Sequence, residues 1–317
     1  MRKPQSVDLN IAARCNATCS HCCVAGSPRA EAHLSAEQVD NIVDDLIAHP
    51  DVCEVGITGG EPLLQARRVL SLIKRISAAG MKTNLTTNGF WAITPERAAR
   101  MTADLESAGL SHLTISYDDF HAPFIKPERI RNALDAASNC SIPTILNMCV
   151  SRTHDSLDLL KELGDSALCV KVTRFPVQQC GTGLSIPDED LIVKPLDKLK
   201  LRCPGFELIY HHDGKVYPCC SPPIFDTDMT LGDAGTLSHE EFIRKGEKNA
   251  LLAIIRTRGI KWLLDRVRET SPFSPAARMT EAVSVCDVCT IIMKDRKALT
   301  KLRPEILEEA RKTHVLP

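Results

Sequence analysis

The order of apolar and amphipathic segments constrains the fold of this chain more than any other feature. Six strand-like apolar segments alternate with five segments of helical periodicity over roughly the first 170 of 317 residues. Strict alternation of this kind predicts parallel strands that are joined by helical crossovers. Because six units follow one another without a dinucleotide-binding glycine fingerprint, the pattern favours an α/β fold with an incomplete (β/α)6 TIM-type barrel over a doubly wound sheet. The predicted strands span 7–13, 52–57, 81–86, 110–117, 142–150 and 167–172, and the predicted helices span 35–48, 65–79, 95–108, 127–138 and 155–163.

The alternation stops after residue 173, where prolines and glycines become frequent. Further along, apolar segments at 206–211 and 215–217 flank Asp213-Gly214, and this arrangement predicts a β-hairpin. Two later segments, at 251–268 and 295–312, have helical character. The expected units are a barrel core over 1–175, a linker over 176–200 and a smaller C-terminal domain with closing helices over 201–317.

Charge and hydropathy exclude several classes of protein. The 39 Lys and Arg residues are balanced by 40 Asp and Glu residues, so no basic excess indicates nucleic-acid binding. No apolar run approaches the length that spans a membrane, and we expect a cytoplasmic protein. In such a chain, 14 cysteines indicate metal or redox chemistry rather than a disulfide framework.

Three cysteines follow the first predicted strand with the spacing Cys15-x3-Cys19-x2-Cys22. A short loop of this kind can turn three thiolates toward one point. Three thiolates on a four-iron cluster leave one iron open to a substrate or cosubstrate. A structural zinc site is the alternative, with His21 or Cys23 as the fourth ligand.

Small and polar residues follow the carboxyl ends of other predicted strands, and in parallel α/β folds this rim binds ligands. The tetrad Gly59-Gly60-Glu61-Pro62 could be an ordinary strand-to-helix turn with proline in the first helical position. Its two glycines would also let a ligand approach the backbone, and its carboxylate could hold an ammonium group. Further rim candidates are Asn88, Ser116, Asp118 and Arg152.

Together, the three-cysteine spacing and the Gly59-Gly60-Glu61-Pro62 tetrad resemble the signature of the radical S-adenosylmethionine superfamily. The resemblance covers about the first 175 residues. It implies that the three cysteines bind a [4Fe-4S] cluster, and that S-adenosylmethionine chelates the fourth iron while the tetrad contacts its ammonium group. Electron transfer would then give a 5′-deoxyadenosyl radical that takes hydrogen from the substrate. His21 lies where the family commonly has an aromatic carbocycle, and histidine can also stack on adenine. By the same resemblance, the ribose and carboxylate contacts fall on Asn88, Ser116, Asp118 and Arg152.

The C-terminal part holds a second set of five cysteines. A structural zinc ribbon is one interpretation of the set. An auxiliary [4Fe-4S] cluster, of the kind found in SPASM and twitch domains, fits better beside a radical enzyme. Such a cluster takes four thiolates, so one thiol is left over. The five are Cys203, Cys219, Cys220, Cys286 and Cys289.

Three longer runs resemble the radical S-adenosylmethionine peptide epimerases, which install D-amino acids in ribosomal peptides. The runs are SYDDFHAPF (116–124), CPGFELIYHHDG (203–214) and YPCCSPPIF (217–225). The resemblance implies that Cys220 returns a hydrogen atom to the peptide and that Glu207 lies near it. It also implies two [4Fe-4S] clusters, a precursor peptide as substrate, and a one-electron donor such as flavodoxin or ferredoxin. The auxiliary ligands would be Cys203, Cys219, Cys286 and Cys289.

Two other functions remain open at this point. Another peptide modification on the same scaffold, such as thioether crosslinking or oxidative maturation, would not need a spare donor thiol. A non-enzymatic, zinc-stabilised peptide-binding protein is the more distant alternative. The first predicted strand begins at residue 7, so we expect no separate leader-binding domain ahead of it.

Four of the remaining cysteines are expected to take no part in the chemistry. Cys53, Cys149 and Cys169 lie in apolar strand segments and should pack as small buried side chains. Cys23 is expected to be a bystander, because its spacing from Cys19 fits the signature less well than that of Cys22.

Overall fold

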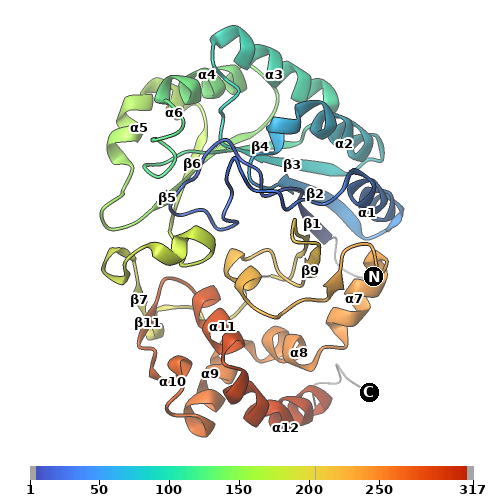
Figure 1. The fold of residues 1–317 in the computed structure, drawn as a ribbon, viewed down its shortest axis with the longest axis vertical. Coiled ribbons are helices and arrows are strands. Elements are labelled where there is room, and N and C mark those ends of the chain that lie inside the picture. The colour runs from blue at the N-terminus through green and yellow to red at the C-terminus, as the bar shows by residue number, and fades with distance from the viewer. Residues whose placement is uncertain (1–4, 204, 313–317) are drawn as a thin grey trace.

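A computed structural model describes residues 5–203 and 205–312. Among the described strands, nine form one sheet in the order β10-β9-β8-β1-β2-β3-β4-β5-β6, and β7 pairs with β11. Helices α1 to α6 cover the outer face of the barrel part, while the later helices gather on the other side of the molecule (Figure 1). The strands are β1 Gln5–Asn10, β2 Val52–Thr58, β3 Lys82–Thr87, β4 His112–Ser116, β5 Thr144–Val150, β6 Lys171–Pro176, β7 Lys194–Pro195, β8 Leu208–Tyr210, β9 Lys215–Tyr217, β10 Gly232–Asp233 and β11 Glu281–Ala282.

Helices in the first half alternate with the strands, as the sequence predicts. The six strands β1 to β6 pair in chain order, and each neighbouring pair is parallel. In the described structure β6 is the last strand of the sheet, so the barrel is incomplete and the predicted fold class is confirmed. The helices are α1 Ala36–Ala48, α2 Ala66–Ala78, α3 Pro95–Ala108, α4 Pro127–Ser138, α5 Leu157–Leu163, α6 Asp165–Leu168, α7 His239–Glu247, α8 Ala250–Thr257, α9 Gly259–Thr270, α10 Pro275–Arg278, α11 Val285–Lys294 and α12 Arg296–Lys312.

Local signals fix several helix ends. Ser35 caps α1 through a reciprocal capping box with Gln38, because each side chain bonds the other's backbone N–H. Helix α3 begins at Pro95 and ends before Gly109, which has a φ of 88°. Both ends of α3 therefore agree with the prediction.

Two predicted elements are wrong in detail. The strand predicted at 167–172 begins only at Lys171, because Asp165–Leu168 form the short helix α6. The helix predicted at 251–268 is divided into α8 and α9, because Gly259 has a φ of 82° and ends the first helix. In both places the apolar pattern is right, but the bounds differ: the strand begins later than predicted, and the first helix ends earlier.

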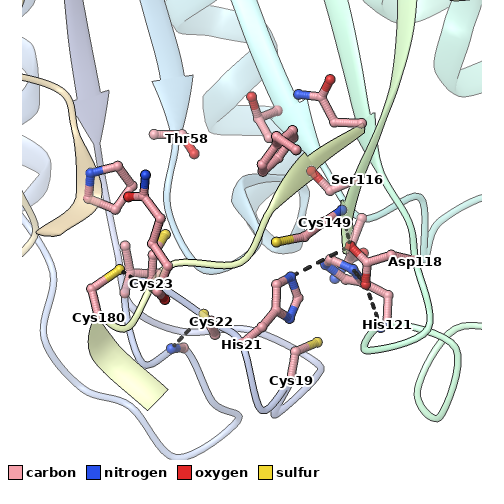
Figure 2. Close-up of a pocket in the computed structure, with 18 of the residues that line it drawn as sticks. Cys19, His21, Cys22, Cys23, Thr58, Ser116, Asp118, His121, Cys149 and Cys180 are labelled. Atoms are coloured by element: carbon pink, nitrogen blue, oxygen red, sulfur yellow. Dashed lines mark hydrogen bonds and ion pairs between the residues drawn. The ribbon is translucent and has the colours of Figure 1, made fainter. Parts of the chain in front are cut away.

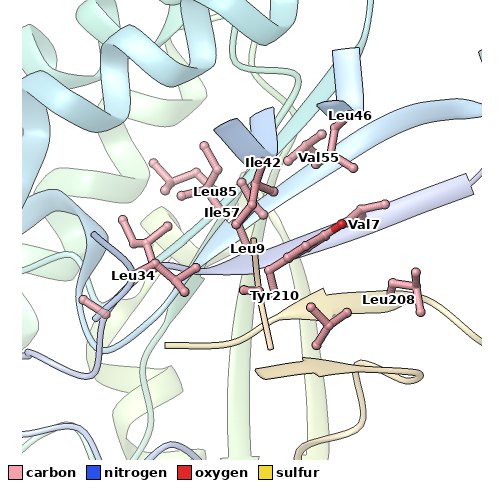
Figure 3. Close-up of a cluster of buried hydrophobic side chains, with 14 of the residues drawn as sticks. Val7, Leu9, Leu34, Ile42, Leu46, Val55, Ile57, Leu85, Leu208 and Tyr210 are labelled. Atoms are coloured by element: carbon pink, nitrogen blue, oxygen red, sulfur yellow. The ribbon is translucent and has the colours of Figure 1, made fainter. Parts of the chain in front are cut away.

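The predicted hairpin extends the barrel sheet. Strands β8 and β9 pair antiparallel, with Tyr210 opposite Val216, and β8 also runs parallel to β1. Leu9 and Tyr210 are register partners across that junction, and both are buried (Figure 3). Burying a side chain of this size stabilises the fold by roughly 1.5–3 kcal/mol. The hairpin that leads to Cys219 and Cys220 is therefore packed directly against the first barrel strand.

Apolar faces of α8, α9, α11 and α12 pack on one another and on the rest of the core. Within the described residues, no helix is long and apolar enough to cross a membrane.

Candidate functional site

A pocket of about 570 Å³ opens at the carboxyl ends of the parallel strands. Its lining comes from the cysteine loop, from the ends of β2 to β6 (Figure 2) and from later residues such as Cys180, Pro222 and Ser284. The structure therefore brings together side chains from segments more than 150 residues apart. The predicted site residues in its lining are Cys15, Cys19, His21, Cys22, Gly59, Gly60, Asn88, Ser116 and Asp118.

The cysteine loop holds its three thiols close to one another. Burial, with smaller contributions from the nearby groups Glu61 and Cys22, raises the pKa of Cys15 to about 11. Burial also raises the pKa of Cys19, with Cys22 and Cys15 as the next causes. Two N–H groups point at the sulfurs: Gly26 donates to Cys22 Sγ at 3.3 Å, and Asn88 Nδ2 donates to Cys15 Sγ at 3.7 Å. Three neighbouring thiols with N–H donors form a donor set that fits an iron–sulfur cluster.

The glycine turn packs against the backbone of this loop. Gly60 N–H donates to Ala12 O at 2.6 Å, and Glu61 N–H donates to Arg14 O at 2.9 Å. A Cβ on Gly60 would overlap the carbonyl oxygens of Ala13 and Arg14. Glycine is required here so that the turn can lie beside the cysteine loop.

The carboxylate of Glu61 is buried beneath the pocket and is not part of its lining. Its oxygens accept hydrogen bonds from Leu63 N, Thr87 Oγ1 and Asn88 N, at distances between 2.7 and 2.9 Å. Burial raises the pKa of Glu61 to about 7, although these hydrogen bonds oppose the rise. The carboxylate thus ties the glycine turn to the end of β3.

Asp118 organises the loop after β4. Its carboxylate accepts hydrogen bonds from Phe120 N, His121 N, His121 Nδ1 and Cys149 N. Burial alone would raise the pKa of Asp118, but His121, His21 and the N–H of Cys149 lower it overall.

His21 is held on the pocket wall. Its ring stacks on Phe120 with centroids 4.7 Å apart. Its Nε2 lies 3.6 Å from Asp118 Oδ2 (Figure 2). Burial lowers the pKa of His21 to about 4, so the ring is neutral near pH 7. A neutral ring in an apolar wall can stack on a flat ligand.

The other rim candidates differ in placement. Ser116 and Asn88 line the pocket, and Asn88 Oδ1 accepts from Phe90 N at 3.1 Å. Arg152 is exposed and lies outside the lining; its N–H donates to Asp190 O. Its assignment as a carboxylate contact gains no support from this position.

Two features of the pocket were missed from the sequence. Thr182 supports the cysteine loop, since its N–H donates to Cys22 O and its hydroxyl to Cys19 O, both at 2.9 Å. Thiols of Cys23, Cys149 and Cys180 also line the pocket. The contacts of Thr182 join segments about 160 residues apart, so no local pattern could indicate them.

The expectation for the remaining strand cysteines is only partly right. Cys149 is buried, whereas Cys53 and Cys169 are exposed. Cys53 faces away from the core on β2, and Cys169 follows the end of α6 rather than lying in a strand.

The second cysteine set assembles at the end of the hairpin and the start of α11. Burial raises the pKa of Cys289, and the nearby thiols Cys219, Cys203 and Cys286 are the next causes. Burial likewise raises the pKa of Cys219, with Cys203 and Cys286 among its charged neighbours. Four thiols that influence one another in this way form a donor set that fits an auxiliary cluster.

Cys220 is directed toward carboxylates. Its thiol donates to Glu207 Oε2 at 3.3 Å. A carboxylate oxygen of Asp8, on β1, lies within 4.8 Å of both that sulfur and a Glu207 oxygen. The structure therefore brings together the two predicted catalytic residues and adds Asp8, which the sequence did not indicate.

Comparisons with known proteins found the following similarities. Residues 9–170 match the family model of the radical SAM superfamily. The chain is 34% identical over 304 residues to YydG of Bacillus subtilis (strain 168), which is named as a peptide biosynthesis protein; the match covers 95% of each chain. It is 33% identical over 164 residues to a GTP 3′,8-cyclase of Geobacter sulfurreducens, with 48% of each chain covered. Among solved structures, BtrN in complex with AdoMet and 2-DOIA aligns with a TM-score of 0.47 and 15% identity, over 76% of this chain and 82% of BtrN.

Proposed function

Because this chain belongs to the radical S-adenosylmethionine superfamily, we propose that it is a peptide epimerase, which converts L-residues to D-residues in a ribosomally made peptide. The relative that matches along nearly the whole chain is named for peptide biosynthesis, and this supports a peptide as substrate. We place the enzyme in the cytoplasm, with a flavodoxin or ferredoxin as its one-electron donor.

The residues present fit two [4Fe-4S] clusters. Cys15, Cys19 and Cys22 would hold the first beside the pocket, whose lining also includes Gly59 and Gly60, and the pocket would take S-adenosylmethionine. When bound, these groups supply a radical that removes a hydrogen atom from a peptide Cα. The auxiliary cluster would be held by Cys203, Cys219, Cys286 and Cys289.

The Cys220 thiol carries the proposal. Four neighbouring thiols are sufficient for an auxiliary cluster, and Cys220 instead donates to Glu207 at 3.3 Å. A protonated thiol that is not a metal ligand can return a hydrogen atom to a carbon radical. If the atom arrives from the face opposite the abstraction, the Cα configuration inverts.

The test uses the reconstituted enzyme under anaerobic conditions with the short peptide encoded beside its gene. In D2O, epimerisation adds one deuteron for each D-residue, and chiral amino-acid analysis identifies the residue. We expect the Cys220→Ala variant to cleave S-adenosylmethionine but to form no D-residue. A product that has lost two hydrogens would instead indicate thioether crosslinking or oxidative maturation.

A matched control is Cys53→Ala, which removes an exposed thiol near the amino end of β2, the end away from the pocket. This variant should keep the wild-type rate. If Cys220→Ala formed D-residues as fast as Cys53→Ala, the assignment of Cys220 as hydrogen donor would be wrong.

A further inference from the structure

Asp8 lies beside Cys220, and the neighbouring strand β2 leaves space for its side chain. It is on β1, and its register partner on β2 is Gly56. A Cβ on Gly56 would overlap Asp8 Oδ1. Glycine in the interior of a strand weakens it, because glycine loses more backbone entropy and packs no side chain. The absent side chain on β2 therefore provides the space in which the Asp8 carboxyl group lies.

The carboxyl group of Asp8 lies close to the carboxyl group of Glu207 and the thiol of Cys220. Oxygens of Asp8 and Glu207 and the sulfur of Cys220 all lie within 4.8 Å of one another. Burial, together with the charges of Glu207 and Glu54, raises the pKa of Asp8 to about 6. Across residues 5–203 and 205–312, no lysine, arginine or histidine side chain forms an ion pair with Asp8 or Glu207. A carboxylate beside Asp8, with no cation to balance two negative charges, favours the protonated form of Asp8.

We propose that Asp8, paired with Glu207, holds the proton that restores the Cys220 thiol after each turnover. This inference rests on the proposed epimerase function. Once Cys220 has given its hydrogen atom to the peptide, its sulfur is a thiyl radical. One electron from the reduced flavodoxin or ferredoxin and one proton from the Asp8 carboxyl group re-form the S–H bond. Asp8 is left as a carboxylate and takes its next proton from solvent, so atoms and charge balance.

Kinetics separate this role from a merely structural one. In the Asp8→Asn variant, Cys220 begins as a thiol, so the first D-residue per enzyme forms at the wild-type rate. Later turnovers lack the proton donor and should be about tenfold to hundredfold slower. The assay is a rapid-quench time course with dithionite as reductant and the short peptide encoded beside the gene. Asp8→Glu, which keeps a carboxyl group, should recover multiple turnovers.

The pH dependence supplies a second readout. Wild-type multiple-turnover rates should decrease as the pH rises through about 6, because Asp8 then loses its proton. Glu54→Gln removes a neighbouring negative charge and lowers the pKa of Asp8, so the decrease should begin at lower pH while the first turnover is unchanged. Equal multiple-turnover rates for Asp8→Asn and the wild type, or loss of the first turnover together with the later ones, would overturn the inference.

An infrared titration of the reconstituted enzyme without peptide tests the proton itself. The spectrum of the wild type minus that of Asp8→Asn should contain a protonated-carboxyl band that titrates near pH 6 instead of near 3.8. A band that titrates near pH 3.8 would show that Asp8 is an ordinary carboxylate, and the inference would be wrong. The infrared result does not depend on turnover, so failure of the proposed function, with no D-residue from the wild type, is distinguishable from failure of this inference.

Discussion

Cys15, Cys19 and Cys22 lie on one loop, whereas Cys203, Cys219, Cys286 and Cys289 come from three separate segments of the chain. The first group is held by local backbone bonds, such as Cys15 N to Ser27 O at 3.0 Å. The second group meets only after the hairpin has paired with β1 and α11 has packed beside it. A metal bound to separate segments contributes its binding energy to the tertiary fold, while a metal on one loop contributes mainly to that loop. The two groups should therefore respond differently when their ligands are removed.

The largest expected difference is between two sets of alanine variants. Replacing Cys15, Cys19 and Cys22 should abolish S-adenosylmethionine cleavage and D-residue formation, with a small change in melting temperature. Replacing Cys286 and Cys289 should remove about half of the bound iron and leave the cleavage reaction, since the loop ligands are intact. The melting temperature of this second variant should fall by on the order of 5–10 °C, because three segments lose a shared ligand.

Iron content, 5′-deoxyadenosine yield and calorimetric melting check these outcomes on the same preparations. If the loop variant were the less stable of the two, the loop would be the stabilising centre and the comparison would be reversed.

The contrast also explains what could be predicted from the sequence. The loop ligands are neighbours in the chain, so their spacing indicates the site directly. Helices 95–108 and 127–138 have the predicted ends; both begin at a proline, and a Thr94 cap and Gly109 also bound the first of them, all signals that act within one turn. Asp8 could not be predicted, because it reaches Cys220 only when β8 lies parallel to β1. Gly56 likewise gives no signal until the register between β1 and β2 is known.

A medium effect is expected from the buried carboxyl group of Glu61, which belongs to the loop site. In the folded chain the pKa of Glu61 is about 7, against an ordinary value of 4.5. The folded state therefore prefers the protonated form, and the unfolded state ionises first as the pH rises. Stability should be greatest below pH 4.5 and should fall by up to roughly 3 kcal/mol as the pH rises through 7.

Denaturant unfolding of the reduced, metal-free protein between pH 4.5 and 8 measures this slope. Glu61→Gln cannot ionise and should flatten it, whereas Glu37→Gln on the exposed face of α1 should leave it unchanged. An unaltered slope in Glu61→Gln would assign the pH dependence to other groups.

The smallest expected effect concerns Thr182, which supports the loop from a segment about 160 residues away. The Thr182 hydroxyl group donates to Cys19 O at 2.9 Å and is also 3.1 Å from Cys22 O. Thr182→Val keeps the shape of the side chain and removes this donor, which should cost about 0.5–1 kcal/mol at an exposed position. Iron should then leave the loop about two- to fivefold faster in the presence of a chelator. Thr300→Val removes a hydroxyl group that donates within α12 at an exposed position, and it should leave the rate unchanged. If Thr182→Val lost iron faster from the auxiliary site than from the loop, residues 180–182 would support the C-terminal cysteines instead of the loop. The contrast between a locally held loop site and a C-terminal site held by separate segments would then be wrong.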